Sequence, residues 1–390
     1  MTLRTWIDEQ VCRLMPERSD KGFYTVSRSA PAAAPPGPVV LMTWGRPEDE
    51  PRPRRLYMAA HSDPPAPEPK PRRLGCCQIA AAVIALLAFY VLLLMGILYA
   101  TGSVDALVAG SEGRQRVDAA CAGVRPYLAA FVHSAPTHGL HRAVVRRTWG
   151  SVRDVDGAAV RVVFVVGRAT GAGAEALQAD LDAEARRHGD LVQADFVDTY
   201  RNLTVKHLVS LRWMLTHCGQ ARFIVKADDD AYLDVFQLVR FMRRTHGDAA
   251  PGALVCNVLP AGTPVQRAGK WAVTPDEFAA AGYPRFCGGL LYLAGPETVA
   301  RLYRAARRDP HPLWVDDAFV TGLAAERAGV EHFYMNLRYT YDLDELRHWA
   351  ASRQPRPLPY MVGHMDAEAG GWAALADRLW QKTLLTSQSA

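Results

Sequence analysis

Three consecutive aspartates, Asp228, Asp229 and Asp230, follow an apolar run in the segment FIVKADDDAYLD, residues 223–234. Adjacent carboxylates repel one another, and a bound divalent cation would remove that cost. Oxygen ligands of this kind suit a Mg²⁺ or Mn²⁺ ion that bridges the phosphates of a substrate. An acidic turn that caps the next helix is the alternative, and the triplet taken alone favours that turn.

Several other classes of site are excluded by the sequence. A calcium loop between two helices needs glycine at its sixth position, where this chain has Leu233. The glycine-rich patterns GxGxxG and GxxxxGKS/T are both missing, which removes the dinucleotide-binding and P-loop explanations. The net charge of +5 is spread over 390 residues without a long basic block, so no nucleic-acid-binding surface is expected.

Alternating strand and helix patterns position the triplet. Short apolar runs bounded by Gly, Pro or Ser predict strands over 127–135, 160–169 and 221–230. Helical patterns cover 173–190, 204–219 and 232–247. The helix over 204–219 is expected to begin with Thr204 as N-cap and to stop at Gly219. Elements in this order build a parallel sheet covered on both faces, whose ligands bind beyond the carboxyl ends of the strands.

Residues 74–100 form a long apolar stretch without a charged residue. At about 1.5 Å per residue they can cross a bilayer core of roughly 30 Å, so we expect a single transmembrane signal-anchor helix. An excess of basic residues upstream keeps the N-terminus cytoplasmic. The expected organisation is a disordered Pro-rich cytoplasmic tail, the span, a short stem and a lumenal domain, over residues 1–73, 74–100, 101–120 and 121–390.

Four cysteines lie beyond the predicted span, in what would be an oxidising compartment: Cys121, Cys218, Cys256 and Cys287. Four cysteines permit two disulfides in three connectivities. The sequence does not choose among these pairings, and buried free thiols are the alternative.

The triplet is one of seven motifs that occur in a particular order. They are HRAVVRRTWG (141–150), FVVG (164–167), DFVDTYRNLTVK (195–206), KADDDAY (226–232), RAGKW (267–271), YPRFCGGLLYLAG (283–295) and VDDAFVTG (315–322). In order and spacing they resemble the β-1,3-galactosyltransferase and β-1,3-N-acetylglucosaminyltransferase family, over about residues 120–385.

The resemblance implies a GT-A fold, an α/β domain with a Rossmann-like mixed sheet flanked by helices. It implies transfer of a hexose from a UDP-sugar to a glycan acceptor on a glycoprotein or glycolipid, with inversion and with Mn²⁺ or Mg²⁺. It also implies residence in the Golgi membrane, in agreement with the type II topology expected from hydropathy. A catalytically silent relative, acting as a membrane-tethered chaperone or glycan-binding module, is the alternative. The donor sugar (galactose, N-acetylglucosamine or N-acetylgalactosamine), the acceptor and the oligomeric state are left open.

The resemblance also implies roles for the two acidic motifs. Asp230 would coordinate the metal directly, with Asp228 and His364 as further ligands. Inverting transfer needs a carboxylate that takes the proton from the acceptor hydroxyl. Asp317 is expected to be that base and Asp316 is the second candidate, although a helix N-cap is the structural alternative for Asp316.

Four further residues are expected near the donor: Arg142, Arg146, Lys226 and Asp229. The two arginines match the family's Arg-x-x-x-Arg-x-Thr-Trp pattern. They would either contact uridine or phosphate, or form buried ion pairs with Asp195 or Asp198.

The donor and acceptor pocket is expected to include Trp271, Gly288 and Gly289, because aromatic faces suit the apolar faces of sugar rings. Asn202 begins a formal glycosylation sequon. Since it also lies at the start of a predicted helix, we expect it to serve in capping and packing more than in carrying a glycan.

Overall fold

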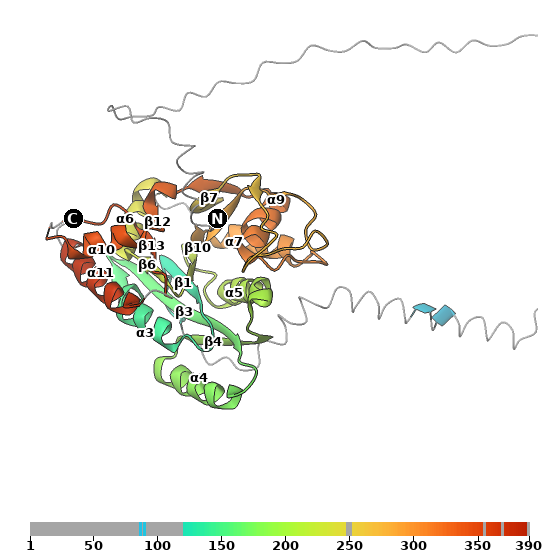
Figure 1. Cartoon of the computed structure of the whole chain (residues 1–390), viewed down its shortest axis with the longest axis horizontal. Coiled ribbons are helices and arrows are strands. Elements are labelled where there is room, and N and C mark those ends of the chain that lie inside the picture. Colours follow the sequence, from blue (N-terminus) through green and yellow to red (C-terminus); the bar gives the residue numbers. More distant parts are fainter. Residues whose placement is uncertain are drawn as a thin grey trace, which may run out of the picture. The chain divides into compact units, whose positions relative to one another are not determined.

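A computed structural model of the chain describes residues 86, 87, 89, 90, 120–246, 252–353, 356–367 and 370–387 (Figure 1). The predicted tail, nearly all of the predicted span and the predicted stem up to residue 119 lie outside these residues. Among the residues that are described, no helix is both long and apolar enough to cross a membrane. The elements discussed below belong to one compact unit, Leu87–Ala390.

Strands and helices alternate along most of this unit. The strands are β1 (Leu128–His133), β2 (Asp154–Val155), β3 (Ala158–Arg168), β4 (Leu191–Val197), β5 (Phe223–Asp228), β6 (Ala231–Leu233), β7 (Ala253–Leu259), β8 (Thr263–Pro264), β9 (Gly282–Tyr283), β10 (Phe286–Ala294), β11 (Glu331–Tyr334), β12 (Tyr339–Thr340) and β13 (Val362–His364). The α-helices are α3 (Gly139–Arg147), α4 (Ala174–His188), α5 (Leu203–His217), α6 (Val235–His246), α7 (Pro296–Ala306), α8 (Asp316–Ala318), α9 (Ala324–Ala328), α10 (Leu343–Ala351) and α11 (Trp372–Ser387). Short 3₁₀ or π-helical turns are η2 (Trp149–Ser151), η3 (Tyr200–Asn202), η4 (Phe319–Leu323) and η5 (Asn336–Arg338).

The main sheet is mixed. Its strand order is β11-β7-β10-β5-β1-β3-β2, with β4 also paired to β3. Strands β4, β3, β1 and β5 run parallel, as the βα alternation predicts. Strand β10 lies antiparallel between β5 and β7, so the sheet does not continue as the purely parallel one that the helix and strand order suggested. The mixed α/β architecture with flanking helices is therefore confirmed.

Both faces of this sheet are covered, which explains why its central strands are apolar throughout rather than alternating. All six residues of β1 are buried. Leu128, Ala130 and Val132 join a core cluster that includes residues of α3, α6 and α11. On the other face, the ring of Phe131 lies 5.9 Å from that of His207 in α5. Each such buried aliphatic or aromatic side chain contributes roughly 1.5–3 kcal/mol by leaving water.

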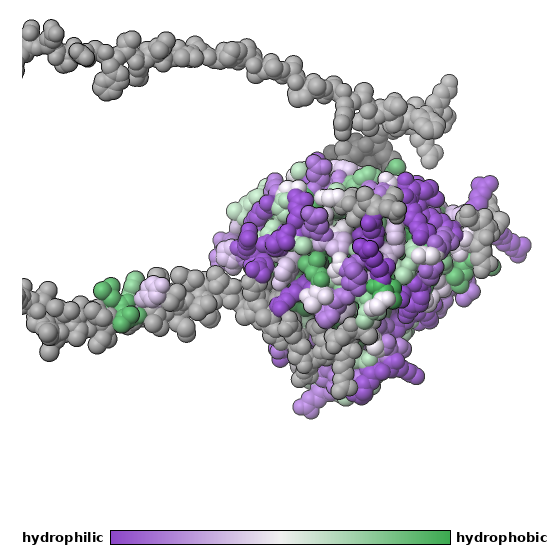
Figure 2. Space-filling model, turned by 180° about the vertical axis from the view of Figure 1, so that it is seen from behind, coloured by the Kyte–Doolittle hydropathy of each residue, from purple (hydrophilic) through white to green (hydrophobic). Residues whose placement is uncertain are grey.

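The surface shown in Figure 2 is mainly hydrophilic, with small and separate hydrophobic areas.

A second, smaller core cluster packs α10 and α11 against Val144 of α3 and Tyr232 of β6. The C-terminal helices thus cover the sheet next to the acidic triplet.

Two expected helix starts are wrong, because pairing with distant segments decides them. Thr204 is not an N-cap: Asn202 precedes the helix, and the Thr204 hydroxyl lies inside it and donates to the carbonyl oxygen of Leu313. Helix α6 begins at Val235 rather than at residue 232, because Ala231–Leu233 pair with β13 as strand β6. Helix α5 ends at His217 with Cys218 as its C-cap, two residues before the expected stop.

The four cysteines beyond the predicted span form two disulfides, Cys121–Cys218 and Cys256–Cys287. The first ties the start of the domain to the end of α5. The second joins the antiparallel neighbours β7 and β10 next to a β-bulge that lies between Cys287 and Tyr292.

Candidate active site

The three aspartates of the triplet do not share one partner. At the end of β5, Asp228 accepts a hydrogen bond from Lys226 Nζ at 2.6 Å. Asp229 is hydrogen bonded to Nδ1 of His138 at 2.9 Å, and Asp230 lies 3.4 Å from Nε2 of His364. Repulsion between adjacent carboxylates is thus relieved by three separate basic side chains in this structure.

Burial and these partners set the charge of each carboxyl group. Burial raises the pKa of Asp228 to about 7, against the opposing effect of Lys226. Burial acts in the same sense on Asp230, but the hydrogen bond and charge of His364 together with the charge of Lys226 outweigh it, so the pKa of Asp230 is lowered. The pKa of His364 is raised, because its interaction with Asp230 exceeds the effect of burial. These opposite shifts favour the ionised carboxylate of Asp230 and the protonated imidazole of His364.

Strand β13 explains how a residue so late in the chain reaches the triplet. It pairs antiparallel with β6, which places His364 opposite Ala231. The backbone N–H of Met365 donates to the carbonyl oxygen of Asp230 at 2.9 Å. His364, which the sequence analysis proposed as a metal ligand, is thus fixed beside Asp230 by backbone hydrogen bonds.

The second acidic motif, Asp316 and Asp317, forms the first turn of α8. Asp316 is buried and hydrogen bonded to Nδ1 of His207 at 2.8 Å. Burial alone would raise its pKa, but His207 and Lys226 together outweigh burial and lower it. The N-cap position belongs to Val315, and no side chain caps this helix, so the N-cap interpretation of Asp316 is wrong.

Asp317 differs from its neighbour because, among the described residues, no basic side chain is hydrogen bonded to it. Its Oδ1 accepts a hydrogen bond from the backbone of Ala318 at 2.7 Å. Burial, followed by repulsion from Asp316, raises the pKa of Asp317 to about 7. Its Oδ2 lies beside Gly289, where an added Cβ would come within 3.2 Å of that oxygen. A carboxyl group with this pKa can take up and release a proton near neutral pH.

Lys226 and Gly289 connect the two acidic motifs. Lys226 is buried, and its Nζ donates both to Asp228 and to the carbonyl oxygen of Gly289. Burial favours the neutral amine, but Asp228 and then Asp316 outweigh it and raise the pKa of Lys226. These contacts run from Asp228 through Lys226 to Gly289, which lies beside Asp317. They bring together residues that are far apart in the sequence.

A side chain at the neighbouring Gly288 would also be crowded. A Cβ there would lie 3.2 Å from the hydroxyl of Tyr341 and 3.4 Å from Nδ2 of Asn257. The ring of Tyr341 lies 6.3 Å from that of His364. The backbone at both glycines is therefore closely packed against the side chains of Tyr341 and Asp317.

Arg142 and Arg146 are held by acidic residues other than the expected ones. Arg142 is buried, and Glu184 accepts hydrogen bonds from its Nε and Nη2, each at 2.7 Å. Arg146 is bound by Asp190 and by the same Glu184. The expected pairing is wrong, because Asp195 pairs with Arg168 and Asp198 with Lys206.

The remaining N–H groups of Arg142 donate to the Ser134 hydroxyl and to the carbonyl oxygens of Ala135 and Pro136. All five donors of this guanidinium are thus in use. The arrangement favours a structural role for Arg142 over contact with a nucleotide.

Trp271 lies in an aromatic group on the surface. Its ring makes an edge contact with Tyr200 at 5.7 Å and stacks on Trp314 at 5.9 Å, and Lys270 lies over Tyr200 at 4.6 Å. Because Tyr200 is 55% exposed, this group offers aromatic faces to solvent.

Asn202 is half-buried, and its side-chain amide donates to the carbonyl oxygen of Val197 at 2.8 Å, which favours the packing role expected for it.

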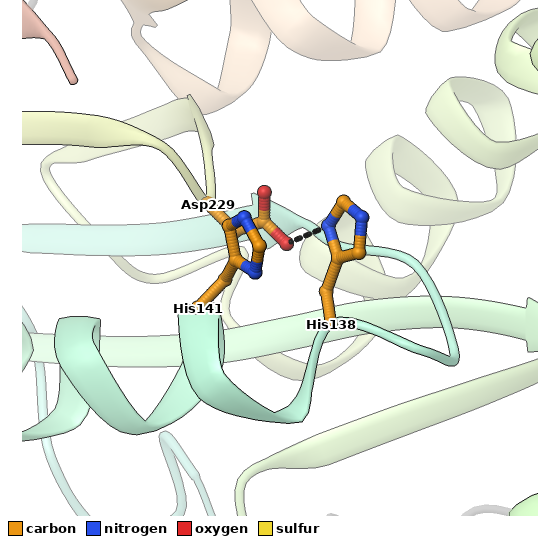
Figure 3. A group of neighbouring side chains, drawn as sticks. All are labelled: His138, His141 and Asp229. Atoms are coloured by element: carbon orange, nitrogen blue, oxygen red, sulfur yellow. Dashed lines mark hydrogen bonds and ion pairs between the residues drawn. The ribbon is translucent and has the colours of Figure 1, made fainter. Parts of the chain in front are cut away.

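The sequence analysis missed four histidines near the acidic residues, of which His133 lies 3.9 Å from Asp316. His207 holds Asp316 and also lies 2.8 Å from the hydroxyl of Tyr292. His138 and His141 lie beside Asp229 (Figure 3), and the three offer ligand atoms within 4.8 Å of one another. Within the described residues this is the one group of three such side chains close enough to hold a metal ion. The available signal was the spacing of His138 and His141, three residues apart, which places both side chains on one side of a helical turn.

The similarity of this chain to known proteins covers the part that holds both acidic motifs. Positions 140–336 match the family described as galactosyltransferase, and the chain belongs to that family. A human acetylgalactosaminyl-O-glycosyl-glycoprotein β-1,3-N-acetylglucosaminyltransferase is 38% identical over 220 residues, which are 54% of this chain and 56% of the relative. A gorilla β-1,3-galactosyltransferase 5 is 32% identical over 215 residues, which are 55% of this chain and 70% of the relative.

The family resemblance expected from the seven motifs is therefore confirmed, and with it the class of sugar-transferring enzymes. The matched segment makes up 56% of the human relative and 70% of the gorilla relative. Among solved structures, a glycosyltransferase involved in glycosylation of the major capsid of PBCV-1 aligns with 65% of this chain and 98% of its own, at 7% identity and a TM-score of 0.35. A likeness of that size adds nothing to the fold described above.

Proposed function

We propose that this protein transfers a hexose from a UDP-sugar to a glycan acceptor in β-1,3 linkage, with inversion at the anomeric carbon. Family membership and the printed names of its relatives support the reaction class. The observation that carries the proposal is the placement of Asp317, a half-buried carboxyl group with a pKa of about 7 whose Oδ2 lies beside Gly289, a residue without a side chain. The donor sugar would be galactose, N-acetylglucosamine or N-acetylgalactosamine.

In this reaction an acceptor hydroxyl oxygen attacks the anomeric carbon while the bond from that carbon to UDP breaks. Asp317 takes the proton that the hydroxyl loses, so one C–O bond forms, one breaks, and UDP leaves with the electron pair. Asp316 stays ionised because His207 holds it, and its charge helps to keep the pKa of Asp317 high enough for this task. Lys226 places positive charge between the two acidic motifs.

Asp230 and His364 fit the expected divalent metal. A carboxylate oxygen and an imidazole nitrogen 3.4 Å apart are close to the separation of neighbouring ligands on one ion. Asp228 is engaged by Lys226, which makes it a weaker candidate for direct coordination. Bound Mn²⁺ or Mg²⁺ would neutralise charge that develops on the departing diphosphate. Substrate phosphates and water would complete the coordination, as is usual for such ions.

We further propose a GT-A fold for residues 121–390, following a cytoplasmic tail (1–73), a membrane span (74–100) and a stem (101–120). The apolar sequence of the span and its basic flank support a type II orientation in the Golgi membrane. Protease protection of a C-terminal tag in sealed membranes tests this orientation. Digestion of the tag without detergent would contradict a lumenal domain.

The reaction is tested by UDP release from the full chain with Mn²⁺, a panel of UDP-sugars and a panel of acceptor glycans. We expect metal-dependent turnover with one donor, strongly reduced in Asp230→Ala. Asp195→Asn removes a carboxylate that is 56% exposed and paired with Arg168, so it serves as a control that should keep wild-type turnover. Folded protein without turnover on any donor and acceptor would favour a catalytically silent relative that binds glycans or assists other enzymes.

A further inference from the structure

His138 and His141 have no role in the proposed transfer reaction, and they form a cluster with Asp229, which the sequence analysis expected near the donor. His138 is the N-cap residue of α3 and His141 lies in the first turn of that helix, while Asp229 lies between β5 and β6. Figure 3 shows both imidazole rings beside the Asp229 carboxylate, with the hydrogen bond between that carboxylate and His138 marked. The ligand atoms of all three residues lie within 4.8 Å of one another.

One ring nitrogen of His141 has no hydrogen-bond partner among the described residues. This atom, Nδ1, is shielded from solvent. A shielded polar atom without a hydrogen bond is destabilising, so it calls for an explanation. The ring is also fixed in place, because it stacks on His138 at 4.1 Å and packs against Trp372 at 4.6 Å.

The chemistry of this donor set differs from that of the acidic triplet. Two imidazole nitrogens and one carboxylate oxygen form a common set of zinc ligands that leaves a further position open. Imidazole favours Zn²⁺ and similar transition metals over Mg²⁺ and Ca²⁺. The side chain of His138 is 40% exposed, which gives an ion access from solvent.

We propose that His138, His141 and Asp229 bind a divalent transition metal ion, of which Zn²⁺ fits the ligands, at a site separate from Asp230 and His364. Zinc bonds of about 2 Å hold tetrahedral ligands roughly 3.3 Å apart. The separation of up to 4.8 Å must therefore shorten, and the exposed ring of His138 is the part that can turn.

The two sites are built on different elements although Asp229 and Asp230 are adjacent. Asp229 faces the start of α3, and Asp230 faces His364 on β13. An ion on Asp229 would tie the turn between β5 and β6 to α3. The ion would thereby fix the position of the backbone at Asp230 even when no nucleotide is bound.

The test measures binding of Zn²⁺ alone to the full chain, after removal of metals, by competition with a chromophoric chelator. All proteins carry His364→Ala, which removes the neighbouring candidate ligand. We expect one Zn²⁺ per chain, and more than about a tenfold loss of affinity when His138→Asn or His141→Ala is added. His188→Ala, a change of an exposed histidine at the end of α4, is the matched control and should leave affinity unchanged.

Thermal unfolding with and without Zn²⁺ gives a second measurement, since an ion that binds only the folded state raises the Tm. The rise should be present in the His364→Ala protein and in its His188→Ala derivative, and lost in the His138→Asn derivative. Absence of Zn²⁺ binding, or equal affinity in all four proteins, would overturn the proposal. Neither result bears on the transferase proposal, because no UDP-sugar is present in the measurement.

Discussion

Asp316 and Asp317 are adjacent and chemically identical, yet the fold gives them opposite properties. His207 holds Asp316 in its ionised form, whereas Asp317 accepts a hydrogen bond from the backbone of Ala318 and has a raised pKa. This is the environment-driven separation of two carboxyl groups that proton-transferring enzymes use. Asp317 is the one of the pair suited to exchange a proton.

Replacing Asp317 with Asn should therefore lower kcat by about 10²–10⁴-fold, because the amide cannot accept the acceptor's proton. The change keeps the size of the side chain, so folding should be retained. UDP release by purified wild-type and Asp317→Asn protein measures the effect, with circular dichroism to verify folding. A folded Asp317→Asn protein with wild-type kcat would exclude this residue as the base.

The pH dependence of the reaction follows from the same group. Burial, and then Asp316, raises the pKa of Asp317 to about 7. A base must be ionised to act, so kcat/KM should rise as pH increases through about 7 and level off above it. Initial rates between about pH 5.5 and 8.5 measure this profile. A flat profile over that range would contradict the assignment.

At the scale of elements, the pairing of α3 with α4 depends on one carboxylate. Glu184 binds both Arg142 and Arg146 and is 17% exposed on its side chain. Burial would raise its pKa, but Arg142 and Arg146 together outweigh burial and lower it. Loss of Glu184 would leave the buried guanidinium of Arg142 without its charged partner.

Glu184→Gln should accordingly lower the free energy of unfolding by about 3 kcal/mol at neutral pH. Because the folded pKa lies below the unfolded one, this contribution is present above the unfolded value and disappears as pH falls through the folded value. Urea unfolding of both proteins at pH 7 and near pH 4 measures the difference, which should shrink at the lower pH. Glu175→Gln in the exposed first turn of α4 is the control, and an equal loss there would contradict the pairing argument.

At the scale of the whole molecule, the disulfide Cys121–Cys218 closes a loop with a sequence separation of 97 residues. Loop closure in the unfolded chain makes such a bond worth about 4–5 kcal/mol. The double change Cys121→Ala with Cys218→Ala should lower the free energy of unfolding by that amount.

Denaturant unfolding of this variant and of the wild type measures the loss. The bond Cys256–Cys287 closes a shorter separation of 31 residues, so the same calculation gives a smaller loss for its removal, about 3.7 kcal/mol. A loss below about 1 kcal/mol for the longer loop would show that the unfolded chain is not restricted in the expected way.

The sequence by itself determined the features that depend on local pattern. Strands β1, β3 and β5 and helix α4 lie within two residues of the expected bounds or inside them, because apolar runs and helical periodicity are properties of neighbouring residues. The ordered motifs also determined the family, which the comparisons confirm.

Only the tertiary structure decided which distant residues meet. Glu184 and Asp190 replaced the expected partners of Arg142 and Arg146, and the pairing of β13 with β6 moved the start of α6. The antiparallel insertion of β10, the disulfide pairing and the cluster of His138 with Asp229 are likewise contacts across long separations. Such contacts depend on how faces of helices and strands pack in space, and a local pattern does not encode which face meets which partner.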